Sequence, residues 1–121
     1  MRITIKATGI EHTNAIDSYV KKALAAVEKV LDPNEKSVLA RIDVGMSTKH
    51  HKTGNIFYAE VTMRLPGKDF RATSKADTLY SAIDAMKDEI TREVKRHHEK
   101  AREDKKKGGR ELKRRIVSEK E

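Results

Sequence analysis

Histidine is the residue type of this chain best suited to metal or proton chemistry, because the sequence has five histidines and no cysteine. His97 and His98 are adjacent on an expected helix, so their side chains point about 100° apart and are poorly placed to share one ion. No Asp or Cys nearby completes a tetrahedral ligand set. His50 and His51 fall in an expected loop, where protonated rings could bind phosphate. We therefore expect surface histidines, no metal and no cofactor.

The residue arrangements typical of catalysis are missing from the sequence. It has no paired carboxylates, no nucleophile beside a base and no phosphate-binding loop, and Gly108-Gly109 lie in a charged tail rather than between a strand and a helix. With 121 residues, 36% of them hydrophobic, the chain predicts one modest core without a large enclosed ligand cavity. We expect a binding protein with no small-molecule substrate, not an enzyme.

The charge balance predicts a polyanionic partner. Lys and Arg number 27 against 19 Asp and Glu, which leaves a net charge of +8. Two blocks supply the excess, since residues 36–75 and residues 105–121 each carry eight basic and three acidic side chains. Acidic residues are mixed through the last expected helix, which argues against a membrane-surface helix. The longest apolar run, residues 23–27, is too short to span a bilayer, and no signal or transit peptide is visible. We expect a protein of the cytoplasm, bacterial rather than organellar, with no membrane partner.

Hydrophobic periodicity divides the chain into six elements. Alternating apolar residues predict strands over 2–7, 38–46, 56–65 and 69–75. Apolar residues at helical spacing predict one helix from Thr13 or Asn14 to Asp32-Pro33-Asn34, and another from about Asp77 to about Asp104. This order, β-α-β-β-β-α, predicts a single α+β domain with a four-stranded sheet and two helices packed on one of its faces.

The chain is expected to divide into a folded domain, residues 1–104, and a basic tail, residues 105–121. The tail has only Leu112, Ile116 and Val117 to bury, so we expect it to be disordered when free.

Two sets of basic residues follow from this arrangement. The outer sheet face would carry cations that include Arg64, Arg71 and Lys75, either as a phosphate-binding surface or as an ordinary solvated face. Helical geometry also places Lys87, Lys95, His98 and Arg102 in one row of the last helix.

The last helix resembles the signature of the ribosome hibernation promoting factors, a family that includes the ribosome-associated inhibitor protein Y. The resemblance rests on residues 78–84, Thr-Leu-Tyr-Ser-Ala-Ile-Asp, followed by Ile90, Arg92, Val94 and Arg96. The first helix agrees through Gly9-Ile10-Glu11-His12-Thr13 and Val27-Glu28-Lys29. The resemblance covers about residues 1–100 and includes the predicted order of helices and strands.

The resemblance implies binding to the small ribosomal subunit. Members of this family occupy the channel for messenger RNA and the A- and P-site transfer RNAs, against 16S-type ribosomal RNA. They keep ribosomes idle and protected under stress or in stationary phase, by occupying a site and without turnover. A rigid wedge with cationic flanks suits a groove lined by RNA phosphates.

The resemblance also assigns individual residues. Lys29 matches a basic position of the family's first helix, and Arg92, Arg96 and Lys100 match the second, spaced to form a row down one side. Tyr80 and Ile83 match the motif but are expected to pack rather than touch RNA. For any one cation, a plain solvated side chain is the alternative reading. The full set of candidate RNA-binding residues is Lys22, Lys29, Arg64, Arg71, Lys75, Lys87, Arg92, Lys95, Arg96 and Lys100.

The sequence departs from the family pattern in several places. Glu89 stands at a position that is often Lys, Ala23 and Ala26 replace frequent bases, and Thr78 replaces an acid. Because these changes weaken the family's contacts on the helix faces, we expect more of the RNA contacts to come from Lys21, Lys22, the sheet face and the tail. The tail is basic where the protein Y branch tends to be acidic. We also expect the chain to lack the dimerisation domain of the long-form branch.

Two other functions fit the same sequence. One is a structured-RNA-binding module not dedicated to the ribosome, in the manner of a double-stranded RNA domain, although that domain opens with a helix and this chain opens with a strand. The other is a protein adaptor or transcription modulator, which would bind its partner in a salt-tolerant way. Phosphate binding would instead weaken steeply with salt, so the salt dependence of binding separates these classes.

Overall fold

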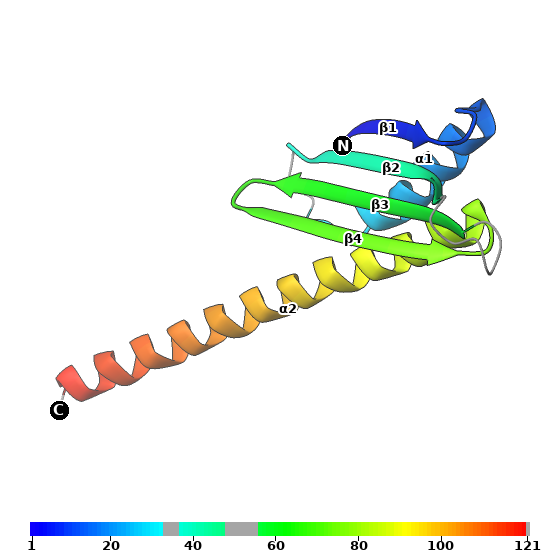
Figure 1. Cartoon of the computed structure of the whole chain (residues 1–121). Helices are drawn as coiled ribbons and strands as arrows, with labels where there is room; N and C mark the ends of the chain where they lie inside the picture. The colour runs from blue at the N-terminus through cyan, green and yellow to red at the C-terminus, as the bar shows by residue number, and fades with distance from the viewer. Residues whose placement is uncertain (33–36, 48–55, 121) are drawn as a thin grey trace.

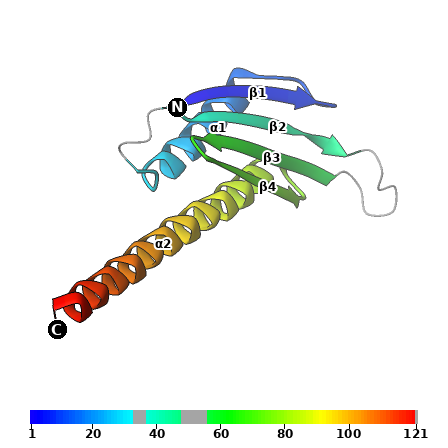
Figure 2. The same ribbon diagram turned by 90° about the vertical axis from the view of Figure 1, so that its left-hand side faces the viewer.

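The computed structural model describes the backbone of residues 1–32, 37–47 and 56–120, and the side chains of these residues as far as Asp104. It contains four strands and two helices in the order β1-α1-β2-β3-β4-α2, and both helices lie on the same face of the sheet (Figures 1 and 2). The predicted α+β architecture is confirmed. The expected loop with Lys49-His50-His51-Lys52 lies outside the described residues.

The sheet follows the order of the strands along the chain. Its strands are β1 (Arg2–Thr8), β2 (Leu39–Ser47), β3 (Ile56–Leu65) and β4 (Lys68–Ala76). β1 pairs with β2 in parallel, and the two other pairs are antiparallel. Pro66 and Gly67 turn the chain from β3 into β4, where Gly67 supplies the positive φ of 81° that this tight turn requires. The predicted strands match these bounds to within one residue at each end.

The core lies between the inner sheet face and the two helices. Alternate strand residues such as Ile42, Val61 and Ala72 are buried beneath helix residues such as Leu24 and Ile90. Apolar burial of this kind stabilises a domain by about 25 cal/mol per Å² removed from water. The opposite side of each strand is left for polar and charged residues, so the alternation in the sequence separates the core from the outer face.

Helix α1 (Asn14–Glu28) begins where the sequence predicts and ends earlier. The Thr13 hydroxyl accepts a hydrogen bond from the Ile16 amide at 3.3 Å and caps the first turn. After Glu28, the Val30 and Leu31 amides donate to carbonyls only three residues back, which tightens the chain into a turn. Leu31 is still buried there. The apolar periodicity therefore runs past the true end of the helix, and the predicted end at Asp32-Pro33-Asn34 is wrong.

Helix α2 (Leu79–Lys120) is longer than expected. The predicted end near Asp104 is therefore wrong. The backbone of α2 is helical through residues 105–120, and the disorder expected of the free tail stays a prediction. Lys, Arg and Glu are good helix formers, and extending an existing helix is much easier than nucleating one, which offsets about 1 kcal/mol lost at each of Gly108 and Gly109. The C-terminal part of α2 projects well beyond the sheet (Figures 1 and 2). The division into residues 1–104 and 105–121 stays a prediction.

Gly45 marks a close approach of three strands. A Cβ atom built on Gly45 would lie 2.2 Å from the Thr8 carbonyl oxygen and 2.8 Å from the Tyr58 hydroxyl. The register places Gly45 between Thr8 of β1 and Tyr58 of β3. Only glycine leaves room for the Tyr58 ring to lie over β2 on the outer face.

Candidate RNA interface

The ten predicted RNA-binding residues do not form one continuous patch. Arg64, Arg71 and Lys75 lie on the outer sheet face. Six of the other seven lie on the two helices that cover the opposite face, and Lys29 directly follows α1. The helical set divides again, into residues beside the groove between α1 and α2 and residues on the outward side of α2. The structure therefore offers two opposed cationic surfaces rather than one.

A groove between the turn that follows α1 and the middle of α2 brings Lys29 and Lys95 together. It has a volume of about 690 Å³, and its lining also includes His98 and Arg102 of the row expected from helical geometry. Asp32 and Glu99 contribute carboxylates to the same lining, so cations exceed acids there even with His98 neutral. An open groove with clustered cations is a suitable place for a phosphate backbone.

The outward side of α2 carries Arg92, Arg96 and Lys100. All three are exposed. Arg96 forms an ion pair with Glu93 at 3.3 Å, whereas Arg92 and Lys100 have no ion-pair partner among the side chains that the structure describes. Exposed pairs of this kind contribute little to stability. The three guanidinium and ammonium groups are thus accessible to a large partner.

Lys22 and Lys87 occupy intermediate places. Lys22 is exposed on α1 and borders a hollow next to α2. Lys87 is only half-buried, and its ammonium lies 3.6 Å from the Asp88 carboxylate. Of these two, Lys22 is the more accessible.

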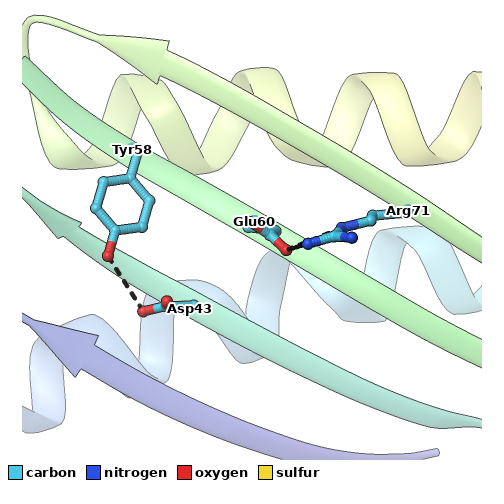
Figure 3. A network of polar contacts seen from close by, with 4 residues as sticks. All are labelled: Asp43, Tyr58, Glu60 and Arg71. Atoms are coloured by element: carbon cyan, nitrogen blue, oxygen red, sulfur yellow. Dashed lines mark hydrogen bonds and ion pairs between the residues drawn. The ribbon is translucent and has the colours of Figure 1, made fainter. Parts of the chain in front are cut away.

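Two acids of the outer sheet face, Glu60 and Asp43, are engaged by neighbouring side chains, as Figure 3 shows for Arg71 with Glu60 and for Tyr58 with Asp43. Arg71 donates to Glu60 across β4 and β3, with Nε 2.9 Å from Oε1. Asp43 accepts from the Thr8 hydroxyl at 3.1 Å and from the Tyr58 hydroxyl at 3.5 Å. Arg64 and Lys75 remain exposed on the same face, without an ion-pair partner within the described part of the chain. This surface is therefore cationic overall, although Arg71 is already engaged.

The two motif residues expected to pack behave differently. Ile83 is fully buried, which confirms the prediction for it. Tyr80 contacts Tyr19 edge-on, with ring centroids 4.7 Å apart, but 45% of it is exposed. Tyr80 lies beside the apolar stripe of α2 rather than within it, and this position in the sequence already indicates partial exposure.

One of the described histidines has a packing role on α2. His97 packs edge-on against Phe70 at a centroid distance of 5.3 Å, which explains why it extends the apolar stripe of α2. Over residues 1–32, 37–47 and 56–104, no group of three or more His, Cys, Asp or Glu side chains could hold a metal ion. Within the same described part of the chain, no helix combines the length and apolar character needed to cross a membrane.

Comparison with known proteins identifies the family. Residues 3–102 match the Sigma 54 modulation protein / S30EA ribosomal protein family. The chain belongs to this family. Similar relatives include the ribosome hibernation promoting factor of Pseudomonas putida, 29% identical over 100 residues that make up 83% of this chain and 89% of the relative. The ribosome hibernation promotion factor of Picosynechococcus is 28% identical over 101 residues, 83% of this chain and 50% of the relative.

Two solved structures similar to this chain have the same fold. The N-terminal domain of protein Y from Thermus thermophilus matches with a TM-score of 0.67 and 30% identity, over 80% of this chain and 99% of that domain. A ribosomal subunit interface protein from Coxiella burnetii matches with a TM-score of 0.65 over 81% of this chain and 98% of the other, and at 15% identity it supports the fold alone. The resemblance seen in the sequence is confirmed.

Proposed function

We propose that this protein is a ribosome hibernation factor that binds the small ribosomal subunit in the channel for messenger RNA and the A- and P-site transfer RNAs. The match of residues 3–102 to the family, with relatives named ribosome hibernation promoting factor, carries the proposal. It acts by occupying the channel, without turnover, and so keeps idle ribosomes from translating. A ribosome-bound role places it in the cytoplasm.

The helical side of the molecule is the proposed contact surface. The groove between α1 and α2 gathers Lys29, Lys95 and Arg102, and the outward row of α2 adds Arg92 and Lys100. Cations of this density accelerate association with an RNA surface and add affinity through counterion release. The buried residues of α1, and of α2 as far as Val94, fix the two helices against the sheet. The segments that carry Lys29 and Arg92 therefore keep their relative positions, which limits the entropy lost on binding.

Co-sedimentation tests the proposal directly. Purified protein is mixed with isolated small subunits, large subunits or whole ribosomes, with and without messenger RNA and initiator transfer RNA. We expect stoichiometric binding to small subunits that is lost when the channel is occupied. Binding that ignores subunit identity and persists beside messenger and transfer RNA would instead indicate a general structured-RNA-binding module.

A pair of charge-reversal variants tests which surface binds. Arg92→Glu with Arg96→Glu changes the helical side, and Arg64→Glu with Lys75→Glu makes the same charge change on the sheet face. We expect the helical variant to fold normally and to lose most small-subunit binding, because it puts repulsion where phosphates lie. The sheet variant is expected to retain more binding. Full binding by the helical variant would show that the proposed surface is wrong.

A further inference from the structure

Tyr80 is the most conspicuous apolar group on the surface. It is the one large hydrophobic side chain that is exposed among those the structure describes, at 45%. It borders an open hollow of about 500 Å³ between the first turns of α1 and α2, lined also by Ala15, Ser18, Tyr19 and Lys22. This exposure leaves part of an aromatic ring accessible to a partner, next to the Lys22 side chain.

The ring of Tyr80 packs against Tyr19, a neighbour that is itself hydrogen-bonded. Tyr19 meets it in a T-shaped contact, with an interplanar angle of 72°. Tyr19 is itself anchored, because its hydroxyl donates a 2.8 Å hydrogen bond to the Asp84 carboxylate. The Tyr19 hydroxyl is protonated at neutral pH and can donate this bond, which raises the pKa of Tyr19 further. Tyr80 is thus held in place before any partner arrives.

The charge around the hollow suits a nucleotide. Lys22 contributes an exposed ammonium to the lining, and the cations of the α1–α2 groove continue along the same two helices toward Lys29 and Lys95. An acid is also close, because the Asp84 carboxylate of α2 accepts a hydrogen bond from the Tyr19 hydroxyl. An aromatic face beside a lysine is the arrangement with which proteins bind single-stranded nucleic acid, through base stacking and phosphate contact.

We propose that an unpaired base of the small-subunit ribosomal RNA stacks on Tyr80, while Lys22 contacts its phosphate. The inference rests on the proposed function and adds a residue-level contact to it. A base in a duplex has no free face to offer, so this contact selects a single-stranded or bulged nucleotide. The purely electrostatic contacts of the groove carry no such selection.

Three substitutions of Tyr80 separate stacking from simple apolar burial. Phe keeps the aromatic face, Leu keeps the apolar volume and Ala removes both. We expect Tyr80→Phe to bind small subunits like the unmodified protein, and Tyr80→Leu and Tyr80→Ala to bind about 5- to 150-fold more weakly. Thermal unfolding by circular dichroism verifies that each variant is folded. Equal binding by the Leu variant and the unmodified protein would overturn the stacking contact while leaving the ribosomal function intact.

Lys22 is tested through salt dependence. Lys22→Gln is expected to reduce the slope of log Kd against log salt by about 0.7, as for the loss of one phosphate contact to a single strand. The matched control is Lys68→Gln, which removes the same charge from an exposed lysine at the β3–β4 turn, outside the hollow. Equal slopes for the Lys22 variant and the unmodified protein would remove Lys22 from the contact.

A tryptophan in place of Tyr80 reports stacking directly, because the chain has no tryptophan of its own. We expect the fluorescence of Tyr80→Trp to be quenched by small subunits and by a single-stranded oligoribonucleotide, but not by a duplex of the same sequence. Ala85→Trp, exposed on another side of α2, is the control and should not be quenched. Quenching of both variants, or by small subunits alone, would overturn the proposal and point to a protein neighbour. If the unmodified protein does not bind small subunits at all, the proposed function fails first.

Discussion

Tyr19 joins the two helices through a single hydrogen bond. Its hydroxyl donates to Asp84 at 2.8 Å, across 65 residues of sequence. The hydrogen bond is the largest cause of the raised pKa of Tyr19, followed by burial and by repulsion between the phenolate and the carboxylate. A folded-state pKa above the unfolded value adds stability that is complete below the unfolded pKa, near 10, and is lost as pH rises through the folded pKa.

Tyr19→Phe therefore has a pH-dependent effect. We expect the unmodified protein to exceed this variant in free energy of unfolding by a constant amount from pH 7 to about pH 9. The difference should shrink above pH 10, as the Tyr19 hydroxyl of the folded state ionises. Urea unfolding of both proteins across this pH range measures it. Asp84→Asn is the control, because in that background the Phe substitution should lose most of its alkaline dependence; an equal dependence there would contradict the assigned cause.

At the residue scale, exposure could be predicted from the sequence and proximity could not. Arg92, Lys95 and Lys100 are exposed as expected, since each lies off the apolar stripe of α2. Their neighbours depend on the crossing of two helices far apart in the sequence. For this reason Lys29 and Lys95 share a groove, whereas Arg64 and Lys75 lie on the opposite side of the sheet.

Helix α2 has two parts with different support. Its buried residues end at Val94 among the described side chains, and the backbone stays helical to Lys120. At 1.5 Å per residue, the part of α2 beyond Val94 is about 39 Å long. Strand bounds were predictable because alternation stops where a strand stops, but the ends of both helices were not, because burial past α1 and helix propensity along α2 each blur the boundary.

Removing residues 105–121 tests whether this extension contacts RNA. We expect the shortened protein to fold normally, to bind small subunits more weakly and to show a flatter salt dependence, because eight basic and three acidic side chains are lost. Binding assays at several salt concentrations measure both quantities. A matched full-length control reverses the charge of Lys113, Arg114 and Arg115 without shortening the chain. Unchanged affinity and slope in both variants would show that the extension stays outside the interface.

The molecule as a whole consists of a packed domain, made of the sheet, α1 and α2 as far as Val94, and an extension of α2 that has few packing contacts. β2 and β3 are the central strands, paired on both sides, and residues 83–94 of α2 cover the inner face of the sheet. Beyond Val94 no described side chain of α2 is buried. Local opening is cheapest where few apolar contacts must be broken, so the two parts of one helix should differ in stability.

Amide hydrogen exchange should reveal this difference along α2. We expect amides in β2, β3 and residues 83–94 of α2 to exchange slowest, by global unfolding, and amides beyond residue 100 to exchange about a hundredfold faster or more. Mass spectrometry of peptides from the free protein measures the profile. Slower exchange of the extension in the presence of small subunits would accompany docking. Uniform protection along all of α2 in the free protein would contradict the prediction.

The close contact at Gly45 limits the order in which positions 45 and 58 can be substituted during evolution. Tyr58 can be replaced by a smaller residue while Gly45 stays, because removing the ring requires no movement of the backbone. The reverse is blocked, since a Cβ at Gly45 would meet the backbone carbonyl of Thr8 at 2.2 Å whatever occupies position 58. A lineage could therefore lose the glycine only after β1 had shifted away from β2. Among relatives, we expect substitutions at position 45 to occur together with a changed β1 register, and substitutions at position 58 to occur freely.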